Sequence, residues 1–231
     1  MSFGPPARGS EQQAHRVVMR IDIWSDVVCP WCFVGKRNLE AALAELKIDA
    51  EIHWRAFELD PNAPLTSTMS MAEALAAKFG VTLDQAKEMN AQMTAVAKKA
   101  GLNYDLDNAK PRNSLNAHRL AKLAEEQGRG GEIAERLFAA YFTQGADLSD
   151  QETLVALGED VGLEGASILA MLDSDDFIDA VRSDEAMAAD AGFSGVPTIV
   201  IDEQFAIPGA QPPDVLVRLL GKIMAKANSE E

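Results

Sequence analysis

Alternation of apolar and polar residues marks two early segments of the chain as strands. Residues 17–25 (VVMRIDIWS) alternate around β-branched positions, which is typical of a strand. Residues 48–59 (IDAEIHWRAFEL) form a second candidate, whose mixed polarity suits a strand covered on both faces. Between them, apolar residues recur at helical spacing at Val34, Leu39, Leu43 and Leu46. We therefore predict a strand–helix–strand unit, although Gly35 lowers the helix propensity.

Helix-capping signatures replace this alternation in the middle of the chain. In the capping box, a hydroxyl residue is followed three residues later by Glu or Gln. This pattern occurs at Ser70 with Glu73, Thr82 with Gln85 and Ser149 with Glu152. Asn113 or Ser114 can cap a further helix, and residues 132–143 and 183–191 continue the helical pattern. Residues 65–179 therefore predict an all-helical segment.

Strand patterns return near the C-terminus. Residues 197–201 and 204–207, separated by Asp202-Glu203, predict a hairpin. A final helix is expected over residues 214–227, because apolar residues form one stripe along it.

The order of these elements predicts the fold class. Strand, helix, strand, helical block, hairpin and helix indicate an α/β fold, a thioredoxin-like core with a large all-helical insertion. We place the core at residues 19–64 and 180–231 and the insertion at residues 65–179. Residues 1–18 are polar and rich in Gly, Pro and Gln, so we predict a disordered extension there.

Composition and charge exclude several functions. The 231 residues carry a net charge of −15, which would repel nucleic-acid phosphates, so nucleic acid is not an expected partner. The acidic stretch between residues 147 and 190 is interpreted as a solvated helical face. No segment approaches the roughly 20 apolar residues of a membrane span, and the first 18 residues lack a signal-peptide pattern. We therefore expect a cytoplasmic protein that does not bind membranes.

The two cysteines carry the candidate chemistry. They stand in Cys29-Pro30-Trp31-Cys32, at the predicted junction of strand and helix, so no thiol remains for a structural disulfide framework. At the start of a helix, Cys29 occupies the position where backbone N–H groups stabilise an anion. The thiolate is the attacking species in disulfide exchange. Cys29 is therefore predicted as the nucleophile and Cys32, one turn further on, as the resolving thiol.

Two other interpretations of the pair are weaker. Cys-x-x-Cys is also half of a zinc site, but there is no second cysteine pair, and neither His53 nor His118 shows ligand spacing. The two cysteines could also be buried and inert. No metal ion is therefore expected.

Residues near the cysteines are candidates for substrate contacts. Pro30 fits the first helical turn, where its missing N–H costs nothing. Trp31 offers an apolar platform for a substrate, or alternatively packs back on its own helix. In Ser194-Gly195-Val196-Pro197-Thr198, a cis bond before Pro197 would make a sharp turn at the start of a strand. In a thioredoxin-like core, that turn packs against the cysteines and exposes the Val196 backbone to an extended substrate.

Four segments carry a family resemblance: SDVVCPWCFVGK, WRAFELDPNAP, PRNSLNAHRLAKLA and SGVPTIVIDEQFAIPGAQPP. Together they resemble the DsbA-like FrnE family of the thioredoxin superfamily, which is related to 2-hydroxychromene-2-carboxylate isomerases and kappa-class glutathione transferases. The resemblance implies that Cys29 is the nucleophile, Cys32 the resolving thiol and Pro197 the cis-proline.

The same resemblance draws attention to three residues of the insertion. Asn113, His118 and Arg119 match an element that helps to line the active-site cleft in the isomerase relatives. Alternatively, Asn113 only caps its helix, and His118 and Arg119 only lie on the helix surface. Some relatives carry another cysteine pair near the C-terminus. This chain does not, which implies an external reductant or oxidant.

Three functions remain in competition. The complete Cys-x-x-Cys favours a thiol–disulfide oxidoreductase or isomerase acting on a disulfide-containing protein or peptide, or on a small thiol. The alternative is a glutathione-dependent isomerase or transferase acting on small aromatic or electrophilic compounds, which has no need of Cys32. The third is a non-catalytic binding module. We expect no tightly bound cofactor, with glutathione or another cellular thiol as the candidate reductant. The oligomeric state is open, and a homodimer is one candidate.

Overall fold

The structure is a computed structural model that describes residues 18–230, with side chains for residues 18–226. The predicted N-terminal extension, apart from Val18, lies outside these described residues. Among residues 18–230, no helix combines the length and the apolar composition needed to cross a lipid bilayer.

A four-stranded sheet in the order β2-β1-β3-β4 forms the core. β1 (Met19–Ser25) and β2 (Ala50–Ala56) run parallel and are joined by α1 (Pro30–Leu46). β3 (Thr198–Ile201) is antiparallel to β1, and β4 (Phe205–Pro208) completes the hairpin. The three elements predicted at the start of the chain are confirmed, although β2 is shorter than the predicted residues 48–59.

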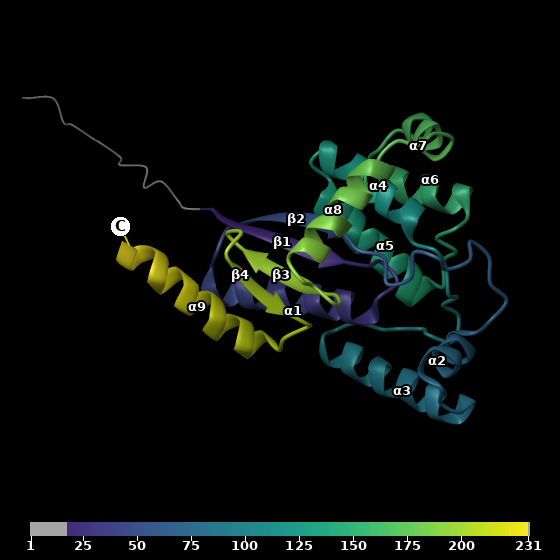
Figure 1. Cartoon of the computed structure of the whole chain (residues 1–231), viewed down its shortest axis with the longest axis horizontal. Coiled ribbons are helices and arrows are strands. Elements are labelled where there is room, and N and C mark those ends of the chain that lie inside the picture. The colour runs from purple at the N-terminus through teal and green to yellow at the C-terminus, as the bar shows by residue number, and fades with distance from the viewer. Residues whose placement is uncertain (1–17, 231) are drawn as a thin grey trace, which may run out of the picture.

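The central strands are apolar because helices cover both faces of the sheet. α1 and α9 (Pro213–Glu230) pack together on one face, whereas α8 (Ile178–Asp190) lies against the other (Figure 1). On that second face the Trp24 indole N–H donates to the Asp184 carbonyl at 2.8 Å. The predicted turn between β3 and β4 is also confirmed, with positive φ values at Asp202 and Glu203, as a two-residue hairpin turn requires.

The insertion is helical throughout the described chain, with no strand between Ala56 and Thr198. Ahead of α8 it contains α2 (Met71–Phe79), α3 (Leu83–Lys99), α4 (Leu115–Glu126), α5 (Gly130–Gln144), α6 (Gln151–Asp160) and α7 (Gly165–Leu172). α2 and α3 lie beside the start of α1, and the other helices gather beyond the edge strand β2 (Figure 1). The predicted α/β fold with an all-helical insertion is confirmed.

Local capping explains both the successes and the errors in this region. The capping boxes at Ser70 and Thr82 are present as predicted. The one predicted at Ser149 is wrong, because Asp150 caps α6 by accepting from the Thr153 N–H at 2.9 Å. A carboxylate satisfies the free N–H groups of a first turn as well as a hydroxyl does. α8 begins at Ile178 rather than Ser183, so the predicted boundary at residue 180 falls inside its first turn.

The sheet and the insertion share one hydrophobic core. Phe33 of α1 stacks on Phe138 of α5, with 5.1 Å between the ring centroids, and on Tyr104 at 6.2 Å. Trp54 of β2 meets Phe138 edge-on at 6.1 Å. These aromatic side chains are almost fully buried. The insertion therefore packs directly against the helix that starts at the cysteines.

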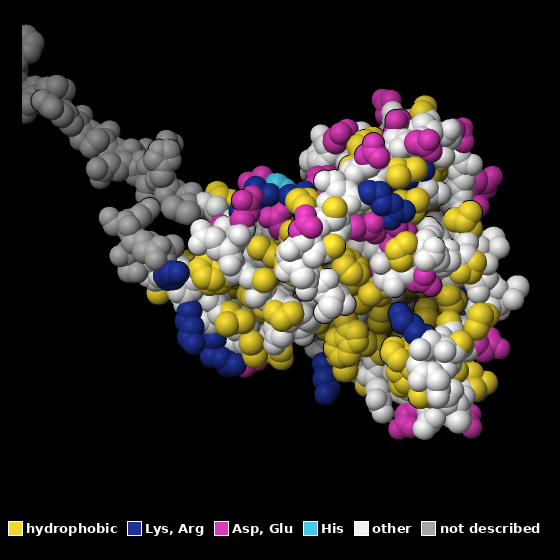
Figure 2. Space-filling view, in the orientation of Figure 1, with side chains coloured by type: hydrophobic (Ala, Val, Ile, Leu, Met, Phe, Trp, Pro, Cys, Tyr) yellow, Lys and Arg dark blue, Asp and Glu magenta, His cyan; other side chains and the backbone are white. Residues whose placement is uncertain are grey.

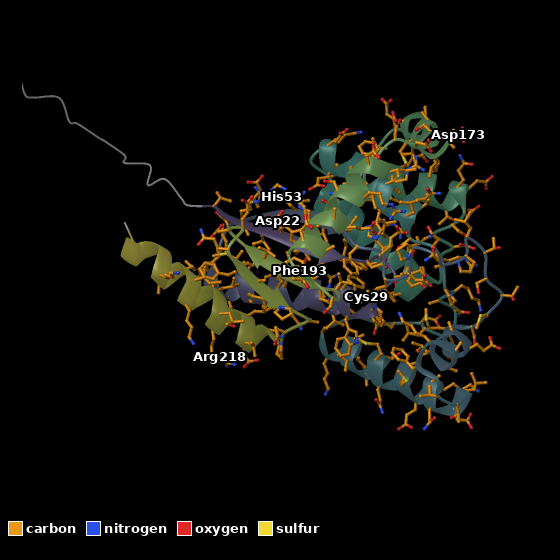
Figure 3. All side chains as sticks on the ribbon, viewed as in Figure 1. Asp22, Cys29, His53, Asp173, Phe193 and Arg218 are labelled. Carbon is orange, nitrogen blue, oxygen red and sulfur yellow. The ribbon has the colours of Figure 1, made fainter. Side chains whose placement is uncertain are left out.

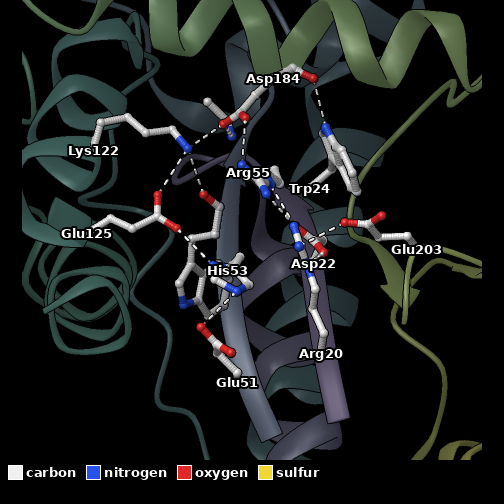
Figure 4. A network of polar contacts seen from close by, with 12 residues as sticks. Arg20, Asp22, Trp24, Glu51, His53, Arg55, Lys122, Glu125, Asp184 and Glu203 are labelled. Atoms are coloured by element: carbon white, nitrogen blue, oxygen red, sulfur yellow. Dashed lines mark hydrogen bonds and ion pairs between the residues drawn. The ribbon is translucent and has the colours of Figure 1, made fainter. Parts of the chain in front are cut away.

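A buried charge network ties the second face of the sheet to the insertion (Figure 4). Asp184 of α8 pairs with Lys122 of α4 at 2.6 Å and accepts from the Ala56 N–H of β2 at 2.8 Å. Arg55 joins Asp184 to Asp22 of β1, at 3.4 and 2.6 Å. Both carboxylates are almost completely buried, and each has two cationic partners, since Arg20 also pairs with Asp22 at 2.8 Å; their charges are therefore compensated inside the protein. The network holds α4 and α8 in fixed positions relative to β1 and β2.

Candidate functional site

The two cysteines lie at the N-terminus of α1, near the junction of the sheet and the insertion (Figure 3). Cys29 is the N-cap residue, with an extended backbone (φ −91°, ψ 114°), and Pro30 opens the first turn as predicted. The Cys29 N–H donates to the Asp26 carbonyl, and the Cys32 N–H to the Cys29 carbonyl, each at 3.0 Å. Both thiols are free, so the pair is in its dithiol form.

A cis peptide bond between Val196 and Pro197 faces the first cysteine. Cys29 Sγ donates to the Val196 carbonyl oxygen at 3.7 Å. The predicted cis geometry and the predicted proximity of this turn to the cysteines are both confirmed. A sulfur that attacks at this place is next to a backbone segment with which an extended chain can pair.

Gly35 explains how α1 can approach the cis-proline turn. A Cβ atom at this position would lie 2.9 Å from Pro197 Cγ, closer than real Cβ contacts come. Glycine is unfavourable inside a helix, so the close approach of α1 to Pro197 accounts for its presence one turn after Cys32.

Both cysteines are almost fully buried, with 2% of Cys32 and 4% of Cys29 exposed. Burial raises the pKa of the Cys32 thiol well above its usual value, and the neighbouring Cys29 raises it further. The Ser25 hydroxyl and the Asp26 backbone oppose this effect in part. Cys32 therefore stays a neutral thiol until a proton acceptor removes its proton.

Tyr104 of the insertion holds the first turn of α1. Its hydroxyl donates to the Pro30 carbonyl at 2.7 Å, and its ring stacks on Phe142 at 4.8 Å. Burial raises the pKa of Tyr104 far above its ordinary value, so the phenol remains a hydrogen-bond donor. Sequence reasoning missed Tyr104, because it lies in the segment between α3 and α4, outside any motif.

Asp26 braces the turn between β1 and Cys29. Its carboxylate accepts from the Val28 N–H at 3.2 Å and from the Leu59 N–H at 2.8 Å. His118 of α4 places Nε2 3.4 Å from Asp26 Oδ1, without the alignment of a hydrogen bond. Asp26 was also missed at the sequence level, although it stands three residues before Cys29, inside the segment that carried the family resemblance.

The three insertion residues suggested by the resemblance have different surroundings. His118 lies beside Asp26 and so reaches the turn before the cysteines. Arg119 donates instead to the carbonyls of Met171, Ser174 and Asp176, so it fixes the segment between α7 and α8. The expectation that both lie on the helix surface is wrong, since each is only 4% exposed. Asn113 lies directly before Ser114, the N-cap residue of α4, and its side-chain oxygen accepts from the Leu115 N–H at 3.0 Å.

The surface near Cys29 is apolar. Apolar side chains gather in Figure 2 over the start of α1 and the neighbouring α2–α3 region. Trp31 is 46% exposed, so a large part of its side chain faces solvent. Trp24 and Trp54, by contrast, are buried within their strands. The exposed tryptophan lies directly between the two cysteines in sequence.

Known proteins are similar to this chain in sequence and architecture. The uncharacterised protein YwbO of Bacillus subtilis is 30% identical over 88% of this chain and 96% of its own length. The crystal structure of a probable DsbA oxidoreductase from Streptomyces coelicolor is 34% identical and has a TM-score of 0.85, covering 90% of each chain. A 2-hydroxychromene-2-carboxylate isomerase shares the fold at 16% identity, with a TM-score of 0.64 over 92% of this chain and 99% of that chain.

The family itself is shown by a match over most of the chain. Residues 20–221 match the DSBA-like thioredoxin domain, a range that includes the cysteine pair, the whole insertion and the cis-proline turn. The family expected from the four sequence segments is thereby confirmed at the level of DsbA-like proteins, and its isomerase relatives are found among the structural neighbours. The chain belongs to the family of DsbA-like thioredoxin domains.

Proposed function

We propose that this protein is a thiol–disulfide oxidoreductase of the FrnE type, in which Cys29 is the nucleophile and Cys32 the resolving thiol. The observation that carries the proposal is the placement of Cys29 Sγ at the N-cap of α1, 3.7 Å from the Val196 carbonyl beside the cis-proline. One helix terminus thus supplies an anion-stabilising position, and one turn supplies the Val196 backbone as a partner for an extended substrate.

The reaction proceeds through a mixed disulfide. The Cys29 thiolate attacks one sulfur of the substrate disulfide, the substrate S–S bond breaks, and the second substrate sulfur leaves as a thiolate. Cys32 then loses its proton and attacks the Cys29 sulfur. An enzyme disulfide forms, and the substrate is released as a dithiol. An external thiol such as glutathione reduces the enzyme disulfide by the reverse steps and is itself oxidised.

The substrate class follows from the surface around the site. Trp31 and the surrounding apolar side chains suit a disulfide-containing peptide or an unfolded protein segment. Pro30 and Trp31 would contact the substrate directly, and the Val196 backbone would pair with it. In the reducing cytoplasm, which we propose as its compartment, the enzyme would act as a reductase or isomerase rather than as an oxidase.

Two assays run in parallel test this proposal. The first follows the reduction of insulin disulfides with glutathione as reductant, and the second follows the conjugation of glutathione to an aromatic electrophile. We expect the wild type to be active in the first, Cys29→Ser to lose at least about 10³-fold in rate as a removed nucleophile does, and Cys32→Ser to accumulate the mixed disulfide. If the wild type conjugates glutathione but does not reduce insulin, and Cys32→Ser conjugates glutathione at the wild-type rate, the protein is a glutathione-dependent transferase instead.

A further inference from the structure

A cleft of about 330 Å³ lies beside the edge strand β2, and neither cysteine lines it. Its apolar lining comes from Ile23 of β1, Leu39 of α1, and Ile52 and Trp54 of β2. The turn between α4 and α5 and the first turn of α5 border its other side. Sites for small molecules typically measure about 300–1,000 Å³ and combine an apolar lining with a few polar groups. In volume and lining, the cleft is suited to a small molecule.

Trp54 brings an unused hydrogen-bond donor to the cleft. The residue is only 8% exposed, and within residues 18–226 its indole N–H has no acceptor. Buried polar atoms normally have a partner in the protein or in bound solvent. The ring also borders a second cavity of about 20 Å³, which has room for a single water molecule. The cleft is therefore the larger of the two spaces in which an acceptor can lie.

The outer edge of β2 provides a second set of polar groups. In a parallel strand pair, the N–H and C=O groups of one residue face the same neighbour. The Phe57 N–H donates to the Ser25 carbonyl of β1 at 3.1 Å, so the odd-numbered residues of β2 face β1. The Trp54 carbonyl faces outward and accepts from Lys122 Nζ at 3.1 Å. The N–H and C=O groups of Ile52 lie on the same outer edge, and no described residue pairs with them.

The first turn of α5 adds another donor. Hydrogen bonding within this helix begins with the Ile133 N–H, which donates to the Arg129 carbonyl at 3.0 Å. Arg129 is the N-cap residue, and its side chain makes no capping hydrogen bond. Gly131 lines the cleft, and its N–H belongs to the first turn, where a helix offers no acceptor.

The charges at the cleft select against anions. Lys36 is the one cation among the lining residues, and its ammonium group already pairs with Glu40 and Glu135 at 2.5 and 2.7 Å. Glu40 and Glu132 also line the cleft, with 43% and 56% of their side chains exposed. A negatively charged ligand would meet these two carboxylates without a free cation to compensate it. The ligand is therefore expected to be neutral.

We propose that this cleft binds a small neutral amide with an apolar body. The amide carbonyl accepts from the Trp54 indole N–H and the Gly131 N–H, and the amide N–H donates to the Ile52 carbonyl. An amide suits a sheet edge because it supplies a donor and an acceptor together. The apolar body packs on Ile23 and Leu39. This site is additional to the proposed disulfide chemistry and does not depend on it.

The three tryptophans of the chain allow a direct test with 3-phenylpropanamide. In ¹H–¹⁵N NMR spectra of the full chain, the Trp54 indole signal should shift and saturate, with a dissociation constant on the order of 10⁻³ M. The Trp24 indole N–H is bonded to the Asp184 carbonyl, so its signal should stay in place. Trp31 lies between the cysteines in sequence, and its signal reports on ligand bound at that surface.

Two analogues test the chemistry of the ligand. The ester methyl 3-phenylpropanoate keeps the carbonyl but lacks the N–H, so it should bind about fivefold more weakly, as expected for one lost hydrogen bond. The anion 3-phenylpropanoate should bind at least about tenfold more weakly, because it meets the carboxylates of Glu40 and Glu132.

Two variants test the position of the site. Trp54→Phe removes the indole N–H and should weaken amide binding about fivefold, measured by the backbone amide signals of Ile52 and Gly131. Gly131→Leu places a side chain at the cleft without a clash, since an added Cβ there meets no atom within 4 Å. It should weaken binding at least about tenfold by obstruction. Gly221→Leu in α9 is the matched control, because the space around it is equally open, and it should bind like the wild type.

The proposal is overturned if the Trp54 signal stays in place, or if only the Trp31 signal shifts, which would locate the ligand at the cysteine surface. Equal binding of amide, ester and anion would overturn it as well, and so would wild-type affinity in Gly131→Leu. Because no thiol takes part in these titrations, such a failure leaves the disulfide chemistry untouched. Conversely, a protein that fails to reduce insulin can still bind the amide.

Discussion

The core and the insertion contribute to the cysteine pair in different ways. The core contributes backbone atoms, because its cis-proline turn places the Val196 carbonyl oxygen 3.7 Å from Cys29 Sγ. The insertion brings side chains, through Tyr104 on the Pro30 carbonyl and His118 beside Asp26. The cysteine pair and the cis-proline turn thus belong to the core, while side chains of the insertion pack around them. Changes in the core should affect the chemistry of the cysteines first, and changes in the insertion should affect the stability of the protein.

The largest effect is expected where the two regions share their core. Phe138→Ala removes a ring that packs on Phe33 and Trp54, and it should lower the free energy of unfolding by about 3–5 kcal/mol. Urea denaturation followed by tryptophan fluorescence and by far-ultraviolet circular dichroism measures this loss. The two signals should change together in the wild type, because sheet and insertion unfold as one unit. Separate transitions would show that the insertion folds on its own.

Gly35 tests the close approach of α1 to the cis-proline turn. Gly35→Ala places a methyl group where Pro197 Cγ leaves only 2.9 Å, so we expect a loss of about 1–3 kcal/mol from overpacking and slower disulfide reduction. Gly221→Ala in α9 is the matched control, because a Cβ added there would meet no neighbouring atom within 4 Å. That control should be stabilised by about 0.5–1 kcal/mol. Equal behaviour of the two variants would contradict the argument about Gly35.

Local signals in the sequence were enough to find the cysteine pair and the cis-proline but not the residues around them. The cysteine pair, Pro30 and Pro197 are recognisable because each has a fixed relation to the next helix or strand. In the sequence, Gly35 only lowers the predicted helix propensity. The residue that leaves no room for a side chain there is Pro197, which is far away along the chain. Asp26 and Tyr104 belong to no periodic pattern, and only the folded chain brings them to the first turn of α1.

The insertion shows the same limit at the level of helices. The Ser70 and Thr82 capping boxes located α2 and α3 because the signal is contained within four residues. α7 was not anticipated: its N-cap Glu164 makes no side-chain cap, so there was no capping signature. The family resemblance pointed to His118 and Arg119, but only tertiary contacts distinguish a residue beside Asp26 from one that holds the segment after α7.

The two thiols should differ in their response to pH. Because burial raises the pKa of Cys32, its alkylation by iodoacetamide should be slower than that of Cys29, and its rate should increase up to about tenfold per pH unit.

The stability of the protein should depend on pH for the same reason. The unfolded Cys32 thiol ionises above a pKa of about 8.5, whereas the folded thiol stays protonated. The free energy of unfolding should therefore fall above that pH, by up to about 1.4 kcal/mol per unit. Peptide mapping and unfolding curves measure both effects, and Cys32→Ser should lack this slope. Faster labelling of Cys32 than of Cys29 would contradict the assignment.

The smallest effect is expected at a single hydrogen bond from the insertion to the active-site helix. Tyr104→Phe removes the hydroxyl that donates to the Pro30 carbonyl at 2.7 Å and keeps the stacked ring, so it should cost about 1 kcal/mol. Tyr141→Phe is a closely matched comparison, because its hydroxyl donates at the same distance to the Lys110 carbonyl, inside the insertion. Both variants should lose similar stability in urea, but Tyr104→Phe alone should change the alkylation rates of the cysteines. If both variants change these rates equally, the insertion affects the site only through general stability, and the contact at Pro30 has no special role.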